Sequence, residues 1–128
     1  DIDAELLFFD LDGFKALNDT HGHRVGDELL QYFASLLMQC FRKADVIARL
    51  GGDEFVVMMA ASNEAANVAI ERLQKMALKE QCSLRRNLSW SVGSVSFDKE
   101  QHESIGSMLE DADSRMYENK LQRRRTGS

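Results

Sequence analysis

The stretch RLGGDEFVVM (residues 49–58) places a glycine pair and an acidic pair between two apolar runs. Because glycine tolerates positive φ, the pair predicts a tight turn joining two strands, Val46–Leu50 and Phe55–Met59. Asp53 and Glu54 at this turn would add little to the stability of a hairpin, and their like charges would repel each other. We therefore expect a positively charged group to meet them.

Other elements are predicted on both sides of this hairpin. The apolar run Glu5–Phe9 ends abruptly at Asp10 and is typical of a buried strand. Apolar residues at helical spacing predict helices over 25–42, from Ser62 or Asn63 onward, and from about Ser104 onward.

One further strand is predicted between the last two helices. Leu88, Trp90 and Val92 alternate strictly, but the alternation slips at Gly93-Ser94, which predicts a β-bulge. The order is then βαββαβ followed by a helix. This order predicts an α+β fold of ferredoxin-like type, with an antiparallel sheet and two helices covering one of its faces.

Composition limits the classes of protein that remain. The chain has 128 residues, 44% of them hydrophobic, and a net charge of −5, which indicates one soluble domain over 1–128. The mild acidity argues against binding of DNA or RNA. Cys40 and Cys82 are expected to be small apolar fillers in a reducing compartment. No apolar run spans a bilayer, so we expect a cytoplasmic domain, attached to a membrane only through segments outside this chain.

The acids at the hairpin have predicted neighbours. In a split βαββαβ sheet the first strand lies beside the central hairpin, so Asp10 and Asp53 should end up on adjacent strands, about 4.8 Å apart. Both carboxylates could then reach one divalent cation at about 2.0–2.1 Å, the magnesium distance. Taken alone, Asp10 and Asp12 could simply end a strand and Asp53 could serve the turn; in combination with the features below, a metal site is favoured.

Two groups of residues could hold phosphates. Backbone N–H groups around Gly13 and Phe14 lie near the start of a helical turn, where anions are favoured, and Lys15 adds a positive charge. Lys120 and Arg124 share a helix face and could neutralise a terminal phosphate. The alternative for the second group is a solvated basic tail.

A third group could recognise guanine. Asn18, His23 and Asp27 follow within one short segment. Asn offers a donor and an acceptor, and Asp can accept from the N1–H and the 2-amino group of guanine; the alternative for Asp27 is a helix cap. His21 and His23 resemble a zinc pair, but no further Cys or His stands at a suitable spacing.

Taken together, these segments resemble the GGDEF family of diguanylate cyclases. The pentapeptide GGDEF (51–55) matches the motif that names the family, and FFDLDGFKALNDTHGHRVGDELL resembles its first strand, phosphate loop and guanine-recognition segment. LSWSVGSVSF and DADSRMYENK resemble its later strand and last helix. The resemblance covers essentially the whole chain. It implies a palm of the nucleotidyl cyclase type that condenses two GTP molecules into cyclic di-GMP, releases pyrophosphate and works as a homodimer.

The resemblance also implies roles for individual residues. It makes Asp10, Asp53, Glu54 and the backbone carbonyl of Leu11 ligands of Mg²⁺, with Mn²⁺ as an alternative. It leaves open whether Asp53 or Glu54 removes the 3′-hydroxyl proton. The residues implied for the nucleotide are Gly13, Phe14 and Lys15 for the phosphates, with Lys15 stabilising developing charge, Asn18, His23 and Asp27 for guanosine, Gly51 and Gly52 in the substrate turn, and Lys120 and Arg124 for the terminal phosphates.

Arg42 and Asp45 match the RxxD motif that product-inhibited members carry before the glycines, which implies an inhibitory cyclic di-GMP site. The family also has an N-terminal helix with a DxLTGLxNR segment that this sequence lacks, and its loss could weaken activity. Arg123 stands where a glycine is common. The alternative functions are a non-catalytic sensor of GTP or cyclic di-GMP, and another palm-type nucleotidyl transferase that uses ATP.

Overall fold

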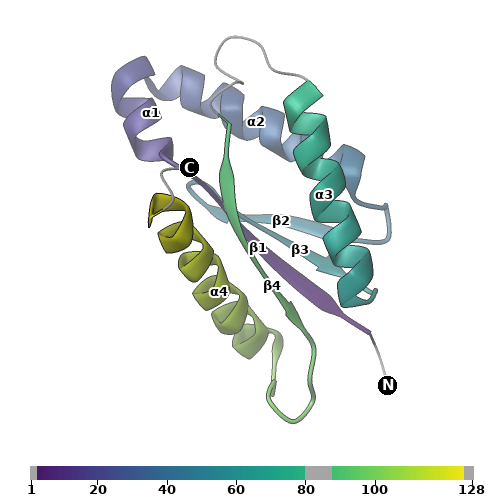
Figure 1. The fold of residues 1–128 in the computed structure, drawn as a ribbon. Coiled ribbons are helices and arrows are strands. Elements are labelled where there is room, and N and C mark those ends of the chain that lie inside the picture. The colour runs from purple at the N-terminus through teal and green to yellow at the C-terminus, as the bar shows by residue number, and fades with distance from the viewer. Residues whose placement is uncertain (1–2, 80–87, 126–128) are drawn as a thin grey trace.

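Within residues 3–79 and 88–125, the part of the chain that the computed structural model describes, four strands form one antiparallel sheet (Figure 1). The strand order is β2-β3-β1-β4, so β1 lies beside the β2–β3 hairpin, as the ferredoxin-like layout predicts. The bounds of the strands are β1 Glu5–Leu11, β2 Val46–Gly51, β3 Glu54–Met59 and β4 Trp90–Ser96.

The helices cover both faces of this sheet (Figure 1). Two of them, α2 and α3, pack on one face, and α4 packs on the other. The three predicted helices are confirmed, whereas α1, which the sequence indicated only as a helical turn, is a separate helix. The bounds are α1 Phe14–His21, α2 His23–Cys40, α3 Asn63–Lys79 and α4 Ile105–Arg125.

Strand β1 is apolar from Leu6 to Phe9 because it is central and covered on both faces. Leu7 and Phe9 point into the core under α2 and α3, where Phe9 meets Phe33 edge to face at a ring-centroid distance of 5.8 Å. Leu6 and Phe8 point into the second core, under α4. The strand runs on to Leu11, two residues beyond the predicted end, so Asp10 lies within the sheet.

The predicted β-bulge at Gly93-Ser94 is wrong. Strand β4 pairs with β1 in continuous register through this point. The alternation slips because the apolar residues change face: Trp90 belongs to the core under α2 and α3, and Val95 belongs to the core under α4. Gly93 faces α4, where a methyl group would overlap the Ala112 carbonyl oxygen. The irregularity in the sheet lies instead in β2, between Arg49 and Gly51.

Two further expectations concern solvent and membrane. Cys40 is buried in the core under α2 and α3, as expected, whereas Cys82 lies outside the described residues. None of the helices in the described ranges combines the length and the apolar character needed to cross a bilayer.

Candidate functional site

Three carboxylates converge at one end of the sheet. Asp10 is the Cα partner of Glu54 across the β1–β3 ladder, so both side chains lie on the face of the sheet that α4 covers. Asp53 precedes Glu54 in the turn, and its backbone carbonyl accepts a hydrogen bond of 3.1 Å from the Leu11 N–H. The convergence of Asp10 and Asp53 that strand pairing predicts is therefore present.

The charges of these acids act on one another. Burial, followed by the closeness of the Asp10 carboxylate, raises the pKa of Asp53 from 3.8 to about 6. Burial also raises the pKa of Glu54, and the charges of Asp10 and Asp113 add to the effect. A site that makes ionisation of adjacent acids unfavourable is one that a cation would stabilise.

One such cation comes from α4. The Lys120 ammonium donates to Asp10 Oδ2 at 2.9 Å, and its charge lowers the pKa values of Asp53 and Glu54. Asp10 Oδ1 is buried and has no hydrogen-bond partner among the described residues. The Asp10 carboxylate thus keeps one buried oxygen that a metal ion could use.

The donor set suits a divalent cation that prefers oxygen ligands. Among the described side chains, no group of three or more His, Cys, Asp or Glu residues is arranged to hold a metal by itself. Mg²⁺ is usually bound by one or two carboxylates, with waters and substrate phosphates filling the other positions. Asp10 and Asp53 fit that pattern, together with the backbone carbonyl of Leu11, the residue that follows Asp10.

The predicted phosphate loop begins directly after β1. Gly13 is the N-cap of α1 and has a left-handed backbone (φ 65°), and no side chain caps the helix. The first N–H groups of α1, including those of Phe14 and Lys15, are therefore available to an anion. Lys15 is exposed beside them.

Asp12 has a structural partner that the sequence analysis missed. Its carboxylate accepts hydrogen bonds from the Ser89 and Ser91 hydroxyls at 3.0 and 2.7 Å. Arg123 on α4 donates to the same carboxylate at 3.0 Å. Arg123 follows Lys120 by three residues, a spacing that puts both on one helix face and could have indicated this contact. Two ion pairs thus join α4 to the end of β1.

The residues predicted to recognise guanine lie on both sides of a corner between α1 and α2. Gly22 makes this corner with φ 91°. Asn18 is on α1, and His23 and Asp27 are exposed on α2. Asp27 also lines an open pocket of about 400 Å³ together with Arg49. The structure therefore brings Asn18 and Asp27 to neighbouring turns of two helices.

The turn of the hairpin is held by a residue that the sequence analysis did not single out. Arg49 Nε donates to the Gly52 carbonyl at 3.0 Å, and Gly52 has a positive φ of 46°. Its position just before the glycine pair could have suggested this role. Arg124 is exposed and, unlike Lys120 and Arg123, forms no ion pair with the acids in the described part of the chain.

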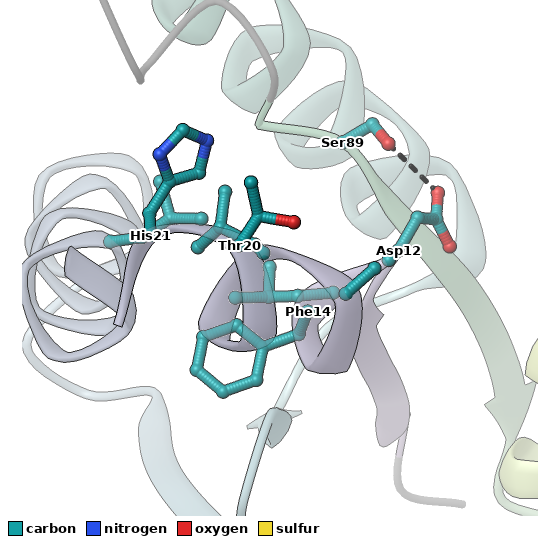
Figure 2. A pocket seen from close by; sticks show the side chains of 10 residues that line it. Asp12, Phe14, Thr20, His21 and Ser89 are labelled. Carbon is teal, nitrogen blue, oxygen red and sulfur yellow. Dashed lines mark hydrogen bonds between the residues drawn. The ribbon is translucent and has the colours of Figure 1, made fainter. Parts of the chain in front are cut away.

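A second pocket, of about 310 Å³, lies beside α1 (Figure 2). Thr20 and His21 lie on one side of it, and the hydrogen-bonded pair of Asp12 and Ser89 lies on the other. Gly13 and Phe14 are among its lining residues, but Asp10, Asp53, Glu54 and Lys120 are not. This pocket is therefore distinct from the cluster of acids.

The RxxD residues form a tight ion pair before β2. Asp45 accepts from Arg42 Nη2 at 2.9 Å, from its Nε at 3.3 Å and from its backbone N–H at 2.9 Å. The Asp45 side chain is 1% exposed and that of Arg42 is 58% exposed. Asp45 therefore orients the Arg42 guanidinium, which remains open to solvent.

The model of the family described as "Diguanylate cyclase, GGDEF domain" matches residues 3–126. Diguanylate cyclase A from Treponema denticola is 37% identical over 121 residues, which cover 90% of this chain and 32% of that protein. The bifunctional diguanylate cyclase/cyclic di-GMP phosphodiesterase MucR from Pseudomonas aeruginosa is 38% identical over 122 residues, which cover 93% of this chain and 18% of MucR. The chain thus spans about a third or less of the length of these relatives.

Solved structures of GGDEF domains are also similar to this chain. The GGDEF domain of TpbB (YfiN) from Pseudomonas aeruginosa superposes with a TM-score of 0.83 at 31% identity, covering 94% of this chain and 73% of that one. The GGDEF domain of DgcB from Caulobacter crescentus, solved in complex with c-di-GMP, superposes with a TM-score of 0.85 at 26% identity, covering 94% and 74%.

Proposed function

The chain belongs to the GGDEF domain family of diguanylate cyclases, and from that membership we propose that it condenses two GTP molecules into cyclic di-GMP and two pyrophosphates. The observation that supports this best is the convergence of Asp10, Asp53 and Glu54 beside the Lys120 ammonium. Such a cluster, next to an open helix N-terminus, suits a metal-bound polyphosphate.

We propose that Asp10, Asp53 and the Leu11 carbonyl hold Mg²⁺, or Mn²⁺ in its place, and that Glu54 helps to hold a second ion. The bound ions would neutralise the attacking and leaving oxygens of the transferred phosphoryl group. The buried, unpartnered Oδ1 of Asp10 supports this assignment. Either Asp53 or Glu54 accepts the proton of the 3′-hydroxyl; both have raised pKa values, which suits a proton acceptor near neutral pH.

The remaining site residues would position the nucleotide. Gly13 and Phe14 would bind phosphate oxygens through their N–H groups, and Lys15 would stabilise the charge that develops there. The guanosine would contact Asn18, His23 and Asp27, the hairpin glycines Gly51 and Gly52 would lie against the substrate, and Lys120 and Arg124 would bind the terminal phosphates.

We propose that two copies of the domain face each other during the reaction. Each 3′-oxygen attacks the α-phosphorus of the other nucleotide in line, so two P–O bonds form, two break, and two pyrophosphates and two protons leave. One site that binds one GTP cannot complete this exchange alone. A homodimer is therefore required for turnover. The relatives are about three or more times longer than this chain, which supports a domain that works within a longer protein. We propose that this domain lies in the cytoplasm.

We further propose that the product inhibits the enzyme at Arg42 and Asp45. The solvent-facing guanidinium of Arg42, oriented by buried Asp45, can stack on guanine and donate to its edge or to a phosphate. DgcB, a structural neighbour, has been solved with c-di-GMP bound.

The test incubates the full-length protein with GTP and Mg²⁺ and measures cyclic di-GMP by chromatography, with Asp53→Ala as the inactive control. Product formation that depends on Asp53 would support the proposal. GTP binding without turnover would show a sensor instead, and selective use of ATP would show another kind of nucleotidyl transferase.

A further inference from the structure

Gly26 occupies the point where α1 and α2 come closest to each other. It is buried in the first turns of α2, immediately before Asp27. A methyl group at position 26 would overlap Asn18 Oδ1, would lie 2.8 Å from Asn18 Cγ and would approach the Phe14 ring to 3.2 Å. The Asn18 carboxamide therefore rests directly on the α2 backbone, in space that a side chain at position 26 would take.

This contact is not explained by helix stability. Glycine within a helix is less stable than alanine, because it loses more conformational freedom on folding. The Asn18 Oδ1 atom is also buried without a hydrogen-bond partner among the described residues. A buried amide oxygen with no partner is also unfavourable. The glycine in the helix and the unpartnered oxygen therefore both lower the stability of the fold.

We propose that Gly26 is a positioning residue for base recognition, which seats the Asn18 carboxamide against α2 so that it faces guanine together with Asp27. This inference rests on the proposed function, because it assumes that Asn18 contacts the base. Asn18 and Asp27 lie on different helices, and only the missing side chain at position 26 lets the first reach the turn that carries the second.

The geometry makes the effect specific to the base. The phosphate-binding groups proposed above are backbone N–H groups at Gly13 and at the start of α1, whereas a methyl group at position 26 would meet side-chain atoms of Asn18 and Phe14. Displacement of Asn18 should weaken binding of the guanine ring and leave binding of phosphates unchanged. A general loss of packing would weaken both.

The test measures binding to the full-length protein by calorimetry, with Mg²⁺ present. The probes are 3′-deoxy-GTP, which lacks the attacking hydroxyl and so cannot react, and inorganic tripolyphosphate, which has no base. The variants are Asn18→Ala, Gly26→Ala, the double variant and Gly106→Ala. Gly106 is a matched control, since a methyl group there would come no closer than 3.4 Å to Ser104 Oγ.

We expect Asn18→Ala and Gly26→Ala each to weaken 3′-deoxy-GTP binding by about tenfold, as for one lost hydrogen bond, without changing tripolyphosphate binding. The double variant should bind no more weakly than either single variant, because both act through one contact. Gly106→Ala should bind both probes like the unmodified protein.

The outcomes separate the two levels of the proposal. If Asn18→Ala leaves 3′-deoxy-GTP binding unchanged, Asn18 does not contact the base and its assignment under the proposed function fails. If Asn18→Ala weakens binding but Gly26→Ala does not, or if the two losses add fully, the role of Gly26 is overturned. If Gly26→Ala unfolds, the double variant decides: recovery of a folded protein on removal of the Asn18 amide supports the overlap, and failure to recover refutes it.

Discussion

The Lys120 ammonium lies 2.9 Å from Asp10 Oδ2, so a residue of the last helix neutralises a buried acid near the end of the first strand. Their side chains are only 19% and 11% exposed, so solvent screens this pair weakly. The Lys120 ammonium supplies a positive charge that compensates the cluster of acids, and a bound metal ion could provide the same compensation.

Substitution of Lys120 tests this relationship. Lys120→Met should lower the melting temperature in EDTA, because Asp10 and Asp53 lose their compensating charge. Mg²⁺ should then raise the melting temperature more than it does in the unmodified protein, and cyclic di-GMP synthesis should fall by about 100-fold. Lys75→Met, at an exposed position of α3, is the control. If Mg²⁺ raised the melting temperature of Lys120→Met no more than that of the unmodified protein, Lys120 and the metal ion would not compensate the same acids.

The raised pKa of Asp53 predicts a dependence of stability on pH. Its pKa is 3.8 in the unfolded reference and about 6 in the fold, so the folded protein binds this proton more tightly. Without metal, the free energy of unfolding should therefore fall as pH rises from about 4 to about 6. Asp53→Asn should reduce this fall and raise the melting temperature at pH 7.5 in EDTA.

The measurement for Asp53 is thermal unfolding across this pH range, with and without Mg²⁺. Glu71→Gln, which removes an exposed carboxylate on α3, is the matched control and should follow the unmodified protein. A melting curve of Asp53→Asn that keeps the full pH dependence would place the titrating group elsewhere.

Gly93 is predicted to be essential for the close packing of α4 against β4. Gly93→Ala would place a methyl group against the backbone of Ala112 and Met116, which cannot move without shifting the helix. We expect the free energy of unfolding to drop by about 1–3 kcal/mol in urea denaturation. Gly106→Ala, in α4 itself, should cause no such loss. Equal stability of the two variants would contradict the predicted contact.

The proposed product site makes a separate prediction. Arg42→Ala should weaken cyclic di-GMP binding by about tenfold or more in calorimetry and should relieve product inhibition, because the oriented guanidinium is lost. Lys43→Ala removes a neighbouring exposed charge and should bind the product normally. Unchanged affinity of Arg42→Ala would show that the product binds elsewhere.

Local patterns were sufficient for most of the fold. The strand before Asp10, the hairpin around GGDEF and three helices follow from apolar spacing and from glycine at a turn. The meeting of Asp10 with the hairpin acids also follows, because a βαββαβ order places β1 beside β3. The β4 prediction failed because alternation indicates one buried face, whereas this edge strand buries residues on both.

The sequence by itself determined the order of the elements, the family and the acids that meet, because these depend on short-range periodicity and on pairing rules between neighbouring strands. Only the tertiary structure decided that Arg123 pairs with Asp12 and that Gly26 makes room for Asn18. Such contacts depend on the angle and distance at which two helices or a helix and a strand approach. That geometry is set by how the two cores fill with side chains from the whole chain, and no local pattern contains it.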